Sequence, residues 1–124
     1  MALAGNTLAK SERLSGKKQV AALLSDGRWG TLGHFRYCWL AQPAAPESAE
    51  GQRAPARIMI SVPKRLFKRA VKRNLLKRRV REAYRVRKID GVDIFFQYNS
   101  PELADFAAIS ADVAAILDRI SEAR

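Results

Sequence analysis

Residues 57–98 read RIMISVPKRLFKRAVKRNLLKRRVREAYRVRKIDGVDIFFQY, and they predict a strand, a long helix and a second strand. The first strand, residues 57–62, ends at Pro63, which cannot donate a hydrogen bond to a sheet. The helix is expected over about residues 66–87, because a turn of about 100° per residue gathers apolar side chains into one stripe. That stripe consists of Leu76, Val80, Ala83 and Tyr84. The second strand is expected at residues 92–98.

Two more elements are predicted before this unit. Residues 17–25 are expected to form a short amphipathic helix, with Ser15 as a candidate N-cap. Residues 34–40, HFRYCWL, are predicted to be a strand because aromatic side chains favour strands. Both faces of this strand carry apolar groups, so it should be central or covered on each side. One face carries Phe35, Tyr37 and Trp39, and the other carries Arg36, Cys38 and Leu40.

A last helix is expected from about Asp105 to Ala123, with Asp105 as its cap and Ser100 as a competing start. Its apolar stripe consists of Ile109, Val113, Ile116, Leu117 and Ile120. Residues 1–12 are expected to be a flexible N-terminus and residues 41–55 a flexible loop. Residues 13–124 are therefore predicted to be one domain. Its fold class is α+β, an α/β sandwich with a small central sheet and three helices.

The charge of the 124-residue chain points to a polyanionic partner. The formal net charge is +11 and the sequence pI is about 10.5. Nucleic acid is the first candidate partner, and an anionic membrane surface is the second. Cys38 is the only cysteine, which is typical of a reducing cytoplasmic setting. Residues 1–14 lack the apolar run of a signal peptide, so we expect a soluble cytoplasmic protein.

The basic residues are concentrated in one segment. Residues 64–88 contain 13 of the 23 Lys and Arg residues, and Glu82 is their only acid. Like charges four residues apart, such as Lys77 and Arg81, destabilise a helix. A helix that only faces water usually mixes its charges. Phosphate groups of a nucleic acid would supply the missing negative charge, so this interpretation is favoured over a solvated basic face.

The motifs of this segment closely resemble those of the bacterial ribonuclease P protein subunit. The resemblance is specific over residues 57–86 and looser over about 10–122. It begins at Arg13-Leu14 and Lys17. Its motifs are Ser61-Val62-Pro63-Lys64-Arg65, Ala70-Val71-Lys72-Arg73-Asn74, Lys77-Arg78 and Arg81-Glu82.

The resemblance implies an RNA-binding subunit of a ribonucleoprotein endonuclease. It implies a left-handed strand–helix–strand crossover, and a catalytic ribonuclease P RNA that uses Mg²⁺ to remove the 5′ leader of precursor tRNA. The protein would have no catalytic residue and bind no metal through its own side chains. Its partners would be that RNA and precursor tRNA, with no DNA or membrane partner. The leader would lie in a cleft between the first helix and the sheet.

The resemblance also implies two sets of site residues. The candidate RNA contacts are Lys64, Arg65, Lys68, Lys72, Arg73, Asn74, Lys77, Arg78 and Arg81. The candidate leader contacts are Arg13, Lys17, Val20, Leu24, Phe35, Tyr37 and Cys38, where the strand residues depend on which face looks out. The Asn74 amide has two open roles, a hydrogen bond to RNA or one to a neighbouring backbone group.

This sequence departs from the family pattern in its first helix. Val20 and Leu24 stand where the family often has aromatic side chains, on which bases can stack. Leader binding would then be weaker or shift to Trp29 or Tyr37. Equally, Val20 and Leu24 can be core residues.

Other chemistry finds little support in the sequence. His34 and Cys38 are expected to be structural, and Asp90, Asp93, Glu102 and Asp105 are expected to be turn and cap residues. One alternative function is a different RNA-binding module, such as a ribosomal or RNA-chaperone protein. A membrane-surface helix is disfavoured, because its apolar stripe is needed for the core.

Overall fold

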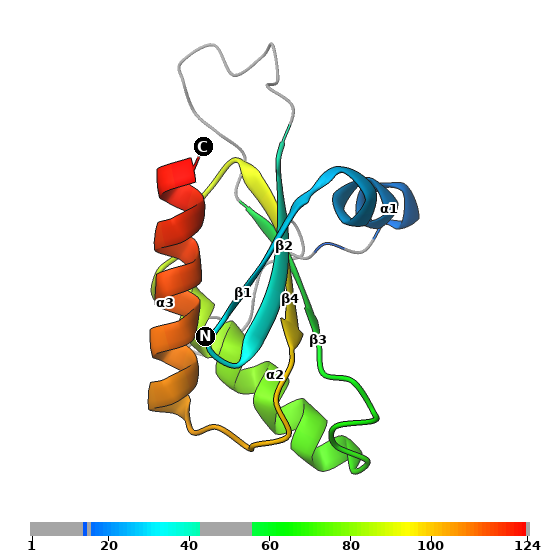
Figure 1. Ribbon diagram of the computed structural model, residues 1–124, viewed down its shortest axis with the longest axis vertical. Helices are drawn as coiled ribbons and strands as arrows, with labels where there is room; N and C mark the ends of the chain where they lie inside the picture. The colour runs from blue at the N-terminus through cyan, green and yellow to red at the C-terminus, as the bar shows by residue number, and fades with distance from the viewer. Residues whose placement is uncertain (1–13, 15, 43–55, 124) are drawn as a thin grey trace, which may run out of the picture.

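The computed structural model describes residues 14, 16–42 and 56–123, which form three helices around a four-stranded sheet (Figure 1). The sheet has the order β1-β2-β4-β3, in which β3 runs parallel to β4 and the other pairs are antiparallel. The expected α+β class is confirmed. The flexible N-terminus expected at 1–12 lies outside the described residues, and so do residues 43–55 of the loop expected at 41–55. That loop was expected to begin too early, because Ala41 still belongs to β2. The elements are α1 (Lys17–Asp26), β1 (Arg28–Leu32), β2 (Phe35–Ala41), β3 (Arg57–Ser61), α2 (Ala70–Arg85), β4 (Val92–Tyr98) and α3 (Phe106–Ala123).

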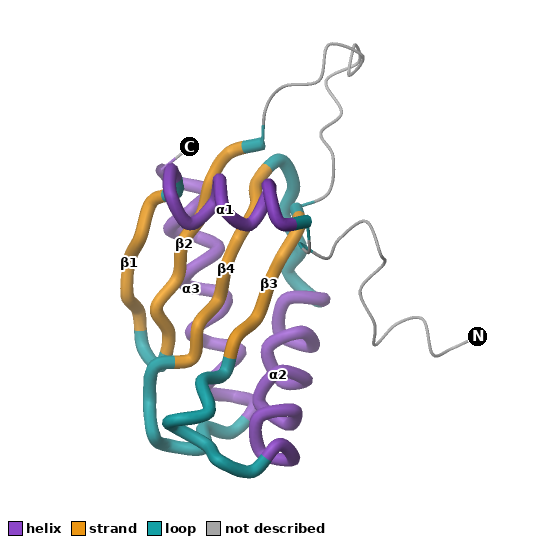
Figure 2. The backbone as a smooth tube through the Cα atoms, turned by 90° about the vertical axis from the view of Figure 1, so that its right-hand side faces the viewer, coloured by secondary structure: helices purple, strands orange, loops and turns teal. Residues whose placement is uncertain are grey.

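The helices cover the two faces of the sheet unequally. Figure 2 shows α1 crossing only the upper part of one face, while α2 and α3 lie behind the sheet on the other face. In the same view β3 and β4 both run downward, and β4 lies to the left of β3. With α2 behind them, this crossover is left-handed, as the resemblance implied, against the usual right-handed preference.

The main core lies between the sheet and the two helices behind it. The stripe expected on α2 is buried, and so is the stripe expected on α3. From the sheet they meet the side chains of one strand face, which include Phe35, Tyr37, Ile94 and Phe96. The apolar patterns therefore identified correctly the inner sides of both helices.

A smaller cluster holds α1 on the opposite face. Leu23 is fully buried and packs with Cys38 of β2, Phe95 of β4 and Leu14. Val20 is half-buried against this cluster, whereas Leu24 is 37% exposed. The expectation that Val20, Leu23 and Leu24 all face a core holds fully for Leu23 alone. The N-cap of α1 is Gly16, and Ser15 lies outside the described residues.

Strand β1 was not predicted from the sequence. Its five residues include Gly30 and show no clear alternation of polar and apolar side chains. It is defined by pairing with β2, through a two-residue turn in which Gly33 has a φ of 58°. His34 therefore belongs to the turn and not to the strand, which begins at Phe35.

The second helix starts at Ala70, four residues later than predicted. Residues 64–69 instead form a turn, in which the amides of Leu66 and Phe67 donate to the carbonyl of Pro63. Phe67 is buried against the ring of Tyr98, and this tertiary contact holds the chain away from helical geometry.

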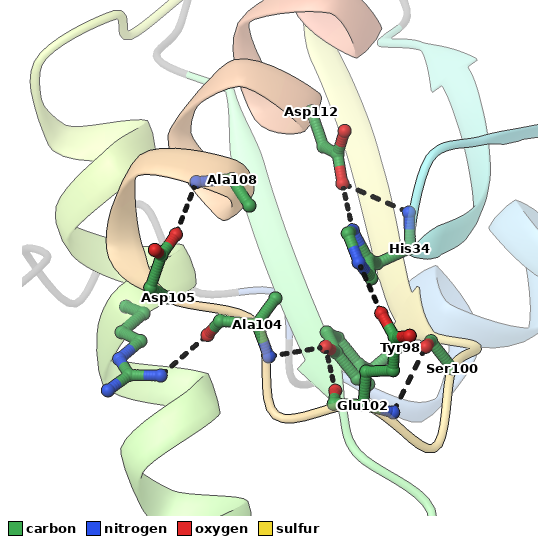
Figure 3. Close-up of polar contacts among 9 residues, drawn as sticks. His34, Tyr98, Ser100, Glu102, Ala104, Asp105, Ala108 and Asp112 are labelled. Carbon is green, nitrogen blue, oxygen red and sulfur yellow. Dashed lines mark hydrogen bonds and ion pairs between the residues drawn. The ribbon is translucent and has the colours of Figure 1, made fainter.

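The start of α3 agrees with the expectation for Asp105. The Ala108 amide donates to the Asp105 carboxylate at 2.9 Å, which is an N-cap bond. Ser100 accepts a bond from the Glu102 amide and so stabilises the preceding turn instead (Figure 3).

Candidate nucleic-acid interface

The basic segment covers the outer side of α2 and the turn before it. We call the nine candidate RNA contacts in this segment the basic surface. Seven of them are exposed, and Arg73 and Lys77 are half-buried. The members are Lys64, Arg65, Lys68, Lys72, Arg73, Asn74, Lys77, Arg78 and Arg81.

Three other arginines of the segment are held by contacts within the protein. Arg79 donates to the carbonyl of Ala104, and Arg87 pairs with Asp118 of α3 at 2.7 Å. Arg85 pairs with Glu82, and the hydrogen bond from Arg85 lowers the pKa of the Glu82 carboxyl. The single acid of the segment is therefore paired with Arg85.

Arg73 differs from the other members of the basic surface. Its Nη1 atom donates to the carbonyl oxygens of Phe67 and Lys68, both at 2.8 Å. The side chain thus turns toward the chain that precedes α2. The Asn74 side chain is exposed and makes no hydrogen bond to another described residue, so neither of its two open roles is decided here.

None of the strand residues expected in the leader cleft has an accessible side chain on the α1 side of the sheet. Phe35 and Tyr37 are 1% and 5% exposed, and they belong to the core beneath α2 and α3. Cys38 is on the α1 side, but it is fully buried and its thiol donates to the carbonyl of Leu23. Burial raises the pKa of this thiol to about 11, so it is protonated at neutral pH. The structure therefore corrects the expectation for these three residues.

The accessible part of the α1 side carries other residues, which we call the open sheet face. Trp29 is 41% exposed, and the Arg36 guanidinium lies 4.2 Å from the centre of its ring. Thr31, Arg36, Gln97 and Ser61 are successive partners across all four strands, and they form a polar row beside Trp29. The open sheet face thus comprises Trp29, Thr31, Arg36, Ser61 and Gln97.

Trp29 was expected from the sequence as an alternative leader contact, whereas the polar row was not predicted. Arg36 and Gln97 stand at alternating positions of predicted strands, so a signal was present. These positions could not be assigned to an accessible face without knowing which face of the sheet α1 covers. Of the other leader candidates, Lys17 is exposed at the start of α1, and Arg13 lies outside the described residues.

A polar cluster joins the β1–β2 turn to α3 (Figure 3). His34 Nδ1 lies 2.8 Å from Asp112 Oδ2, which also accepts a bond from the His34 amide. Glu102 lies 3.6 Å from the other ring nitrogen. These contacts tie the turn to α3, in agreement with a structural role for His34.

The acids near β4 have different roles. Asp93 is buried inside β4, where both its oxygens accept bonds from Arg57 at 2.8 Å, so it is neither a turn nor a cap residue. Within the described ranges, no group of three or more His, Cys, Asp or Glu side chains could hold a metal ion. In those same ranges no helix is long and apolar enough to cross a membrane.

The chain is similar to ribonuclease P proteins along most of its length. A family model described as Ribonuclease P matches residues 8–121. The ribonuclease P protein component of Porphyromonas gingivalis is 32% identical over 124 residues, covering 92% of this chain and 86% of the relative. That of Bordetella parapertussis is 42% identical over 83 residues, covering 67% and 64%.

Solved structures agree in fold. The RNase P protein of Staphylococcus aureus superposes with a TM-score of 0.71 at 23% identity, covering 90% of this chain and 96% of that one. The RNase P protein from Thermotoga maritima gives a TM-score of 0.70 at 22% identity, covering 87% and 96%.

Proposed function

Because this chain belongs to the ribonuclease P protein family, we propose that it is the protein component of a ribonuclease P ribonucleoprotein. In this role it binds the catalytic RNA and the 5′ leader of precursor tRNA, and it assists removal of the leader in the cytoplasm. The observation that carries the proposal is the basic surface, whose cations other than Arg73 line the outer side of α2 and the turn before it.

The basic surface suits the backbone of a folded RNA. Its exposed Lys and Arg side chains can each approach a phosphate, and Arg presents a planar fork that matches two phosphate oxygens. Such contacts release counterions and therefore weaken as the salt concentration rises. The N-terminus of α2 adds to this field, because its first turn contains no acid and Arg69 makes no side-chain cap bond.

The open sheet face suits the single-stranded leader. A base can stack on Trp29, which is 41% exposed, and stacking on an aromatic residue contributes about 1–3 kcal/mol. The polar row offers a guanidinium, an amide and two hydroxyl groups for contacts to bases or sugars. Ser61, the β3 member of this row, precedes Lys64 by three residues, so the open sheet face leads into the basic surface.

In this proposal Trp29 provides the aromatic stacking that the aliphatic side chains of Val20 and Leu24 cannot provide. Its ring packs at right angles to the ring of Phe95, with ring centres 6.2 Å apart, and the Arg36 guanidinium lies over it. Leu24, which is exposed, and Lys17 can contact the strand from the α1 side. Phe35, Tyr37 and Cys38 are left out of this proposed leader site, because their side chains are buried.

The chemistry in this proposal belongs to the RNA. Mg²⁺ bound by the RNA supplies the catalytic metal, and the protein's own residues bind and orient the RNA strands. No residue of the chain is assigned a catalytic role.

The direct test is cleavage of precursor tRNA by a bacterial ribonuclease P RNA at low Mg²⁺, with and without the chain. We expect the chain to restore correct 5′ processing, and the protein alone to leave the substrate intact. A chain that binds RNA tightly but restores nothing would be a general RNA-binding module, and the proposed function would be wrong. Replacing Trp29 by Ala should weaken binding of substrates with a leader more than binding of mature tRNA.

A further inference from the structure

Arg73 lies on the inner side of α2 and not on its outer side. Residues 73, 76 and 80 are spaced i, i+3 and i+7, so their side chains follow one line along the helix. Leu76 and Val80 are fully buried on that line. Arg73 lies on the same line, one turn before Leu76, near the N-terminus of α2 and beyond the core. Its side chain is therefore directed toward the protein.

The Arg73 side chain meets the turn of residues 64–69. Each N–H of Nη1 has a partner, since the atom donates to the carbonyls of both Phe67 and Lys68 at 2.8 Å. Among the described residues, the backbone bonds within the turn run from the amides of Leu66 and Phe67 to the carbonyl of Pro63, at 3.1 and 3.3 Å. Hydrogen bonds from a charged donor are roughly twice as strong as neutral ones, so Arg73 is a main support of this turn.

The turn has one anchored side and one charged side. Phe67 is 7% exposed and packs on Tyr98, with ring centres 5.8 Å apart. Lys64, Arg65 and Lys68 are exposed on the same short segment, where their like charges repel one another. Arg73 is itself a cation, but its two hydrogen bonds to the carbonyls of Phe67 and Lys68 hold the turn together against this repulsion.

We propose that Arg73 is a positioning residue, which fixes the turn so that Lys64, Arg65 and Lys68 meet the RNA phosphates together. This inference rests on the proposed function, since it assigns the turn to RNA binding. It differs from the expectation that Arg73 is one more phosphate contact. The two roles give different results when the cations of the turn are removed.

The test is a double-mutant cycle on the affinity of the full chain for ribonuclease P RNA. One axis is R73A, and the other removes the three cations of the turn by alanine substitution. A positioning residue acts through the turn, so we expect R73A to cost about tenfold with the turn intact and less than about twofold without its cations. Equal losses in both backgrounds would overturn the inference and make Arg73 an independent phosphate contact.

Two controls separate charge from geometry. K72A removes an exposed cation one residue away and should be additive with the turn variant. R73K keeps the charge but not the planar fork, so its affinity should fall close to that of R73A. Wild-type affinity in R73K would contradict the positioning role.

Hydrogen exchange of the free protein tests the turn without RNA. The amides of Leu66 and Phe67 should exchange about tenfold faster in R73A than in wild type, and K72A should leave them unchanged. Unchanged exchange in R73A would show that Arg73 does not hold the turn. Failure of the wild-type chain to bind the RNA would instead overturn the proposed function and, with it, the positioning role. An unchanged thermal midpoint in R73A would exclude global unfolding as the cause of lost affinity.

Discussion

Helices α2 and α3 pack side by side on the same face of the sheet, and each buries one apolar stripe against it. Their outer sides differ. The exposed residues of α3 include small residues, acids, one arginine and Phe106, whereas those of α2 include Lys72, Arg78 and Arg81 without an exposed acid. The N-terminus of α3 is capped by Asp105, while that of α2 has no side-chain cap. The buried apolar stripes explain why both helices pack on this face of the sheet. The outer side of α2 carries positive charge that no exposed acid of this helix balances, which points to an anionic partner.

The inner sides can be compared by removing one buried side chain from each helix. Leu76 of α2 and Ile116 of α3 are both fully buried. Changing either one to Ala should lower the free energy of unfolding by about 2–5 kcal/mol, because the lost contacts leave a cavity. Urea unfolding followed by circular dichroism measures this. A loss below about 1 kcal/mol for Leu76 alone would mean that α2 contributes little to the core.

The outer sides can be compared at equal net charge. The double variant K72A/R78A on α2 and the double variant A111E/S121E on α3 each lower the net charge from +11 by two. All four positions are exposed, so both variants should fold. At low salt we expect the α2 variant to lose roughly ten- to a hundredfold in RNA affinity and the α3 variant less than about threefold. Similar losses, measured by filter binding, would mean that overall charge and not the basic surface attracts the RNA.

Changing the N-cap residues of the two helices should change stability by smaller amounts, and in opposite directions. D105A removes the cap of α3 and should cost about 1 kcal/mol of stability. R69N introduces a cap at α2 and should add up to about 1 kcal/mol, because an Asn side chain can accept an orphan amide bond. Thermal or urea unfolding of both variants checks the signs. If R69N is more stable but binds RNA more weakly, the positive, uncapped N-terminus of α2 lowers stability and favours RNA binding.

The inner side of each helix could be predicted correctly from the sequence. Helical periodicity depends only on local geometry, so the order of apolar residues was enough to identify the stripes of α2 and α3. The strand at 92–98 was predicted with its bounds, and the cap of α3 was predicted at Asp105. Each of these features has a short-range cause.

What could not be predicted depends on packing between distant parts of the chain. Alternation along β2 separated Phe35 and Tyr37 from Arg36 and Cys38, but it cannot say which set α1 will cover. β1 was missed because it is held by pairing with β2, not by its own composition. The two hydrogen bonds of Arg73 were likewise hidden, since they depend on the turn before α2, which is held by the burial of Phe67 against Tyr98.

The most direct test of the account is the salt dependence of binding to ribonuclease P RNA in two single variants. R78A removes an exposed cation of the basic surface, and R87A removes a cation that pairs with Asp118. We predict that the slope of log affinity against log salt becomes shallower by about 0.7–0.9 in R78A, the value expected for one lost phosphate contact, and stays unchanged in R87A. Equal slopes in R78A and wild type would contradict the claim that the outer side of α2 contacts the RNA backbone.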